Sequence, residues 1–239
     1  MSKMKVAEKV LFLFRDTEGF ASAILDALHP NPSSSFTRRD DVFDFSLEGY
    51  GINNHKASGN VFHYVDDLGI YQVSVLVMQH YEPPVLACAL NEVLNKIIGD
   101  GSSLLPTLLV PFLVASSKVK GQSKPHESKA LVYGIQIGQN TDTMMAIQNK
   151  TQEPPSSLQI QHETLACFLH FVRVMNLPTL FLIGQTGQHS ENDAELETIH
   201  EIGKILASGA GLQFSEDKVK WNLKKVTKAS KEPWRALYG

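Results

Sequence analysis

The chain has 239 residues, 43% of them hydrophobic, so it can build a sizeable core without disulfides or a structural metal. Its net charge of −3 argues against a general nucleic-acid or membrane-surface binder. The charge is uneven, because residues 218–239 hold seven basic residues and one acid, a net +6 that leaves −9 on the rest.

The cysteines and the N-terminus indicate a reducing compartment. Cys88 and Cys167 each lie in an apolar helical pattern, which is typical of a buried, reduced thiol. The first residues carry Lys and Glu before an apolar run, Val10–Phe14, that is too short for a signal or membrane segment. The sequence therefore predicts a location in the cytoplasm, with the nucleus as a second compartment.

Strand-like and helix-like segments alternate along the chain, which predicts an α/β fold. Strands are predicted at Val10–Phe14, Val42–Leu47, Asn60–Val65 and Tyr71–Met78. A short helix is predicted over Phe20–Leu28, and Asp66–Gly69 is typical of a hairpin turn. The three strands after the short helix should make an antiparallel region.

The remainder of the chain continues the alternation. Further strands are predicted at Thr107–Val114, Leu131–Ile137 and Thr179–Ile183, and helices from Pro83-Pro84 to Ile98, over Gln161–Met175, from Ser190 to Ala207 and over Glu216–Lys228. The polar stretch Ala115–Lys129 is predicted to be a mobile loop. Together these elements predict a Rossmann-like mixed sheet flanked by helices, as one domain over residues 1–214. Residues 215–239 follow as a basic amphipathic helix and an extended tail.

One loop is a candidate ligand site. Gly184–His189 follows a predicted strand and precedes a predicted helix, where open α/β sheets bind ligands and a helix N-terminus can hold an anion. It lacks the third glycine of a dinucleotide fingerprint and the Lys-Ser/Thr pair of a phosphate loop. An enzyme or small-molecule binder that uses this loop stays open as an alternative function.

No other pattern nominates chemistry. His162-Glu163 and His200-Glu201 each lack the second histidine that would place two imidazoles on one helix face. We therefore expect no catalytic residues, no metal and no cofactor. The basic stretch Lys218–Lys231 leaves a nucleic-acid partner as a weaker alternative, although its basic residues alternate with apolar ones as on a packed helix.

The chain ends in Pro233-Trp234-Arg235-Ala236-Leu237-Tyr238-Gly239, where Pro233 stops any helix and favours an extended end. A hydrophobic residue, a tyrosine and any terminal residue form the motif by which proteasome activators and assembly chaperones insert between α-subunits. The helix, proline turn and strand across Val174–Ile183 are also similar to the proteasome assembly chaperone family, specifically the first subunit of its heterodimeric pair.

The resemblance implies a non-enzymatic chaperone that forms a heterodimer with a second chaperone and docks on the proteasome α-ring. It implies that Leu237, Tyr238 and Gly239 bind the partner, with no nucleic acid or membrane involved. In this interpretation Leu237 supplies apolar burial, Tyr238 supplies a ring and a hydroxyl, and the Gly239 carboxylate pairs with a pocket lysine.

Overall fold

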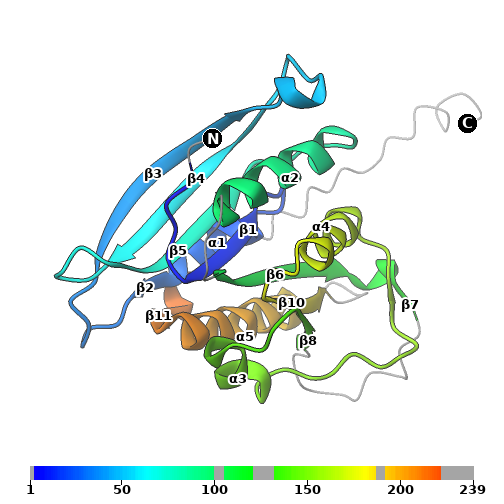
Figure 1. The fold of residues 1–239 in the computed structure, drawn as a ribbon. Helices are drawn as coiled ribbons and strands as arrows, with labels where there is room; N and C mark the ends of the chain where they lie inside the picture. Colours follow the sequence, from blue (N-terminus) through cyan, green and yellow to red (C-terminus); the bar gives the residue numbers. More distant parts are fainter. Residues whose placement is uncertain (1–2, 100–104, 121–131, 187–191, 222–239) are drawn as a thin grey trace, which may run out of the picture.

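The computed structural model describes residues 3–99, 105–120, 132–186 and 192–221 (Figure 1). Within them, a seven-stranded mixed sheet has the order β3-β4-β5-β1-β6-β10-β8. Its strands are β1 (Lys9–Phe14), β3 (Thr37–Ser46), β4 (Lys56–Val65), β5 (Tyr71–Met78), β6 (Thr107–Ala115), β8 (Val132–Ile137) and β10 (Thr179–Thr186). The short strands β2 (Leu28–Pro30) and β11 (Leu212–Phe214) pair with each other, as do β7 (Val119–Lys120) and β9 (Gln159–Ile160).

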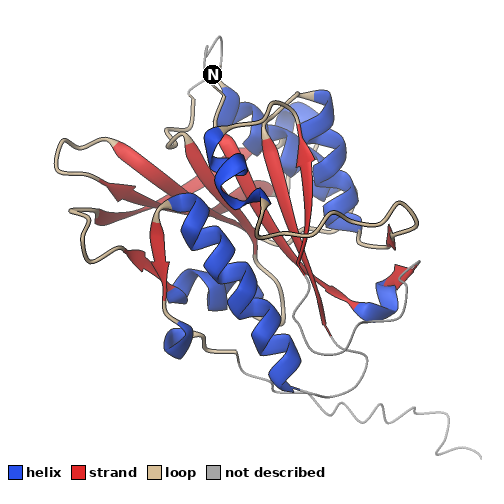
Figure 2. Ribbon diagram, turned by 90° about the horizontal axis from the view of Figure 1, so that it is seen from below, coloured by secondary structure: helices blue, strands red, loops and turns tan. Residues whose placement is uncertain are grey.

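Helices cover both faces of this sheet. They are α1 (Phe20–Ala27), α2 (Val85–Ile98), α3 (Asp142–Gln148), α4 (Glu163–Val174) and α5 (Asn192–Ala210). In Figure 1, α2 and α4 lie above the sheet and α3 and α5 below it; Figure 2 shows α5 running across the lower face. Side chains of α1 belong to the same buried cluster as those of α5, so α1 covers the lower face as well.

The central strands are apolar because both of their faces are buried. In β1, Val10 and Phe12 join the cluster under α2 and α4, whereas Leu11 and Leu13 join the cluster under α1 and α5. All four side chains are at most 1% exposed. Since successive strand side chains point to opposite faces, a continuous apolar run is what a strand between two helix layers requires.

The main sheet combines parallel strand pairs in its centre with antiparallel pairs at both sides. β5, β1, β6 and β10 are parallel neighbours, while β3 and β4 extend one side and β8 closes the other, each antiparallel. The β4–β5 turn is held by the Asp66 carboxylate, which accepts the N–H groups of Leu68 and Ile70, both at 2.9 Å. Gly69 supplies the left-handed residue of this turn, with φ of 78°.

The β3–β4 hairpin is fastened to α2 near its far end. Tyr50, in the 3-10 helix between these strands, donates its hydroxyl to the Glu92 carboxylate at 3.1 Å and accepts from the Asn91 amide at 2.9 Å. Lys96 pairs with Glu92 at 3.4 Å, so the buried carboxylate has both a hydroxyl and a cation as partners.

The predicted mixed α/β sheet with flanking helices is confirmed. Sequence reasoning missed α3 and the four short strands. The predicted loop Ala115–Lys129 begins instead as the end of β6, a 3-10 helix at Ser116–Lys118 and strand β7; its residues 121–129 lie outside the described ranges. None of the helices in the described part of the chain combines the length and the apolarity that a membrane-spanning segment requires.

Candidate functional site

The carboxyl ends of the parallel strands form the edge where this fold would bind a ligand. From β1 the chain reaches β5 on one side through α1 and the β3–β4 hairpin, and it then reaches β6 on the other side through α2. Open α/β sheets bind ligands in the crevice at such a reversal of strand order. The residues that follow β1 lie at this reversal of strand order.

The N-terminus of α1 is occupied by the chain's own carboxylate. Asp16, just after β1, accepts the backbone N–H groups of Glu18, Gly19, Phe20 and Ala21 at 2.9, 2.6, 3.0 and 3.0 Å. These are the free donors that would hold a phosphate at the first helix of a nucleotide-binding α/β fold. With Asp16 in place, this site is closed to an anion.

The surroundings of Asp16 are acidic. Partial burial is the main cause that raises the pKa of Glu18, and the carboxylates of Asp16 and Glu195 raise it further. The side chain still reaches solvent, and Lys118 opposes the shift. This edge therefore repels anionic ligands and suits a cationic neighbour.

The candidate loop Gly184–His189 differs from expectation. Gly184, Gln185 and Thr186 continue β10 and pair with the last residues of β6. A Cβ at Gly184 would collide with Thr198 of α5, so this glycine permits close packing of a helix on a strand. Residues 187–189 lie outside the described ranges, and the described half of the loop is sheet, with no phosphate cradle in it.

Histidine and cysteine positions give no metal site. No group of three or more metal-ligating side chains occurs in the described ranges. His63 is buried on β4, where Nδ1 lies 2.9 Å from Ser74 Oγ and the ring stacks on Tyr71 at 4.2 Å. Cys88 and Cys167 pack against the cluster under α2 and α4 but are only half-buried, so the predicted burial of these thiols is partial. Burial, then the Glu163 carboxylate, raises the pKa of the Cys167 thiol.

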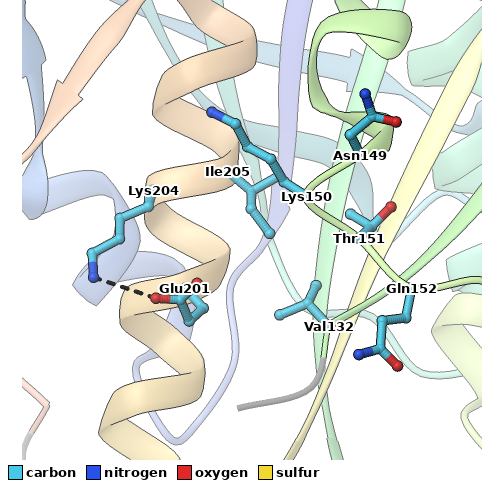
Figure 3. A pocket seen from close by; sticks show the side chains of 8 residues that line it. All are labelled: Val132, Asn149, Lys150, Thr151, Gln152, Glu201, Lys204 and Ile205. Atoms are coloured by element: carbon cyan, nitrogen blue, oxygen red, sulfur yellow. Dashed lines mark hydrogen bonds and ion pairs between the residues drawn. The ribbon is translucent and has the colours of Figure 1, made fainter. Parts of the chain in front are cut away.

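A hollow of about 490 Å³ lies between α5 and the segment after α3 (Figure 3). Its lining residues are Val132, Asn149, Lys150, Thr151, Gln152, Glu201, Lys204 and Ile205. Figure 3 shows Lys204 directed at Glu201, with 3.3 Å between Nζ and Oε1, and Lys150 donates to Ser208 at 2.6 Å. Since its charged groups already have partners within the chain, the hollow presents no free catalytic constellation.

The C-terminal segment Leu212–Trp221, which we name the strap, connects the domain to its tail. β11 pairs with β2, and the Ser215 N–H donates to the carbonyl of Ala27 at 2.9 Å. Next, Glu216 contacts Lys204 at 2.8 Å and His200 at 3.3 Å. The ion pair with Lys204 lowers the pKa of Glu216 and raises that of Lys204.

The strap returns along α5 toward the start of that helix. It contacts His200 and Lys204 first, and Trp221 then donates its indole N–H to Glu195 at 3.4 Å, in the first turn of α5. Because α5 follows β10, the described chain ends beside the carboxyl edge of the sheet. Val219 and Trp221 pack on the cluster under α1 and α5.

The predicted helix Glu216–Lys228 was wrong in its described part, which has only a 3-10 helix at Glu216–Lys218. Val219 and Trp221 contact one surface with a spacing of two, as in an extended chain, and this packing replaces the helical periodicity. The predicted binding residues Leu237, Tyr238 and Gly239 lie outside the described residues. Sequence reasoning missed that Glu216 and Trp221 contact α5, and the two-residue spacing of Val219 and Trp221 was the available signal for an extended segment.

Comparison with solved structures places the fold. A Pyrococcus furiosus archaeal proteasome activator, PbaB, superposes with a TM-score of 0.52 at 8% identity, over 100% of this chain and 96% of that one. A PAC2 family protein from Streptomyces avermitilis gives 0.52 at 9% identity, over 88% of each chain. A Mycobacterium tuberculosis protein of unknown function gives 0.54 at 10% identity, over 91% of this chain and 75% of that one. The chain thus has the α/β fold of PAC2 family proteins.

Within that fold class, the sequence itself identifies the family. The profile of the DUF7894 domain, a domain of unknown function, matches residues 4–239, so the chain belongs to the DUF7894 family. No curated protein matches it significantly in sequence.

Proposed function

We propose that the chain is a non-enzymatic chaperone for assembly of the proteasome core particle, which docks on the α-subunit ring through Leu237, Tyr238 and Gly239. The observation that carries the proposal is the combination of this terminal triplet with a strap that fixes where the tail begins. The fold shared with an archaeal proteasome activator supports the same class of partner. We place the protein in the cytoplasm or the nucleus.

The tail has the length and chemistry for insertion between subunits. Residues 222–239 number eighteen beyond Trp221, so covalent geometry allows a reach of at most roughly 60 Å. The Gly239 carboxylate and a pocket lysine would form a charge-assisted bond, which contributes about 1.5–3 kcal/mol. One tail alone would bind weakly.

A partner subunit with a second tail would allow two weakly binding tails to attach firmly to the α-ring. We propose that the chain forms a heterodimer with a second assembly chaperone that carries its own docking tail. After one tail is seated, the other binds at a high effective concentration, which strengthens attachment without preventing later release.

The alternative of an enzyme or small-molecule binder at Gly184–His189 has less support. The first half of this loop is strand, and Asp16 fills the N-terminus of α1, a helix that starts at the same edge of the sheet. We also propose that nucleic acid is not a partner, since Trp221, within the basic stretch Lys218–Lys231, bonds to Glu195 at the acidic edge of the sheet.

Terminal docking is tested by Tyr238→Ala and by adding one residue after Gly239. Both changes should reduce co-purification with α-subunits of assembling core particles, since the first removes ring burial and the second displaces the carboxylate. Ser230→Ala, in the same tail, is the matched control and should bind as the wild type does.

Thermal unfolding of each variant completes the experiment. Unchanged stability with lost binding supports docking through the tail. Full binding by both variants would mean that other surfaces carry the interaction, and lost stability would mean that Leu237 and Tyr238 belong to the core. Salt-sensitive binding of RNA or DNA by the intact chain would instead support the nucleic-acid alternative.

A further inference from the structure

Strand β3 forms an open edge of the sheet. It is bonded to β4 on one side, and in the described ranges no strand pairs with its other side. All side chains of residues 37–42 are exposed, and Val42 is 69% exposed. β3 contains no proline or glycine, which commonly interrupt such an edge, and its charged side chains are of both signs, so they can pair with those of a second strand.

Two hydrogen bonds identify the backbone groups that point outward. The Gln79 N–H donates to the Ser58 carbonyl at 3.0 Å, so even-numbered residues of β4 bond toward β5 and odd-numbered ones toward β3. In the β3–β4 register, odd-numbered residues of β3 then bond to β4 and even-numbered ones point outward. Val42 agrees, because its N–H is bonded to its neighbour Asp41 at 2.8 Å.

We propose that β3 pairs antiparallel with β3 of a second copy of this chain, around a two-fold axis at Asp40, and so joins two sheets into one. Antiparallel pairing requires residues directly opposite each other to share a face, so even-numbered residues meet even-numbered ones. With the axis at Asp40, Arg39 of each copy lies opposite Asp41 of the other. Arg38 of each copy lies opposite Val42 of the other.

The charges select this register over its neighbours. An axis at Arg39 would place two guanidinium groups directly opposite, and an axis at Asp41 would place two carboxylates there, at the closest type of pair. With the axis at Asp40, the closest pairs are the two Arg39–Asp41 pairs. The two Asp40 residues occupy a hydrogen-bonded pair, about 5.5 Å apart at Cα rather than about 4.5 Å. Each also keeps its own Arg38 partner at 2.9 Å.

The bond between Asp41 and the Val42 N–H protects the edge in the single copy. On pairing, the Asp41 carboxylate turns to Arg39 of the other copy and releases this N–H to the Arg38 carbonyl opposite it. Polar groups that point to water in one copy are thereby satisfied in the pair. The interface is isologous, so it closes at two copies and does not extend into a fibre.

The test is a charge reversal measured by sedimentation velocity on the full chain. Arg39→Asp and Asp41→Arg each place like charges opposite one another, and each should weaken self-association about tenfold or more, because two pairs become repulsive. An equimolar mixture of the two variants should recover association, since the copy that is acidic at both positions then lies opposite the copy that is basic at both. The double variant, which carries both Arg39→Asp and Asp41→Arg, should associate with itself without a second variant.

Matched controls carry the same change of charge elsewhere on the exposed surface. Arg173→Asp on α4 and Asp67→Arg in the β4–β5 turn should associate as the wild type does. Wild-type protein that stays monomeric at its highest soluble concentration overturns the proposal. Association that survives both single reversals also overturns it and assigns the dimer to another surface.

Val42→Pro tests the backbone contribution. Because the Val42 N–H does not bond to β4, proline should leave the melting temperature close to that of the wild type while it removes two bonds across the proposed axis. Unchanged melting with lost association supports pairing through β3. Retained association by this folded variant contradicts it, and a variant that unfolds shows that the assigned outward direction of Val42 is wrong.

Discussion

The central strands and the strap are held to the domain in different ways. β1, β6 and β10 are buried between two helix layers by side chains that alternate from face to face. The strap is held by a three-residue strand pair, the contacts of Glu216 and one indole N–H bond from Trp221. Burial of the first kind determines whether the chain folds, while the second kind of contact fixes the course of residues 212–221 along α5. Changes in the two regions should therefore separate global stability from the position of the strap.

The largest effect is expected in the central layer, from Phe168→Ala. Phe168 is fully buried and meets Phe12, Phe14 and Phe181 with ring centroids 4.8, 5.5 and 5.8 Å apart. Removing it leaves a cavity and should lower the free energy of unfolding by about 3–5 kcal/mol. Urea denaturation measures the change.

The half-buried Phe171, on the same helix, provides the control. Phe171→Ala should cost clearly less, because its side chain is only partly removed from water. Equal losses for the two variants would contradict the assignment of Phe168 to the centre of the core.

A smaller effect is expected where the strap meets α5. A Cβ at Gly203 would collide with the ring of Phe214 in β11, so Gly203→Ala should displace the strap and cost about 1–3 kcal/mol, less the gain in helix propensity. Phe214→Ala should also destabilise. Together the two should cost less than their sum, since the new methyl group occupies space left by the ring. Additive losses in urea denaturation would show that the two residues do not touch.

The amino-acid pattern was sufficient to predict the strands of the main sheet but not the structure of the strap. Val10–Phe14 and, within the predicted strand Thr179–Ile183, residues Leu180–Ile183 are continuous apolar runs, and such runs predict strands that are buried on both faces. β2 and β11 have three residues each and are stable only because they pair across more than 180 residues of chain. No local pattern specifies such a pair.

The candidate site shows the same limit. The predicted position at strand ends was reasonable, yet the role of Asp16 depends on four N–H groups that converge only after α1 forms. Gly184 was interpreted as a loop glycine, whereas it accommodates α5 against β10. The terminal triplet was found from its residues alone, and its role stays a prediction.

A pH-dependent effect is expected from His63, a polar residue within the buried sheet. Burial, assisted by Lys5, lowers the pKa of His63 below its ordinary value of 6.5, and Asp41 opposes the shift. Between the folded and unfolded pKa values the unfolded chain binds more protons, so stability is full above 6.5 and falls as the pH drops through this interval. His63→Gln should make urea stability less dependent on pH below 6.5, and an unchanged dependence would contradict the assigned role of His63.

The smallest effect is expected from Glu216→Gln, which weakens the ionic contacts of the strap with Lys204 and His200. Because these groups are partly exposed, global stability should barely change. Local opening is a more sensitive measure, because Glu216 adjoins Ser215 and β11, and hydrogen exchange at β11 and Ser215 should become faster. In the wild type, Lys204 lowers the pKa of Glu216 from its ordinary 4.5, so the same loss of protection should occur as the pH falls through the folded pKa, below 4.5.

Glu197→Gln, on an exposed position of α5, supplies the control. Unchanged exchange in Glu216→Gln would mean that β11 pairing and the contacts of Trp221 hold the strap without the ion pairs of Glu216.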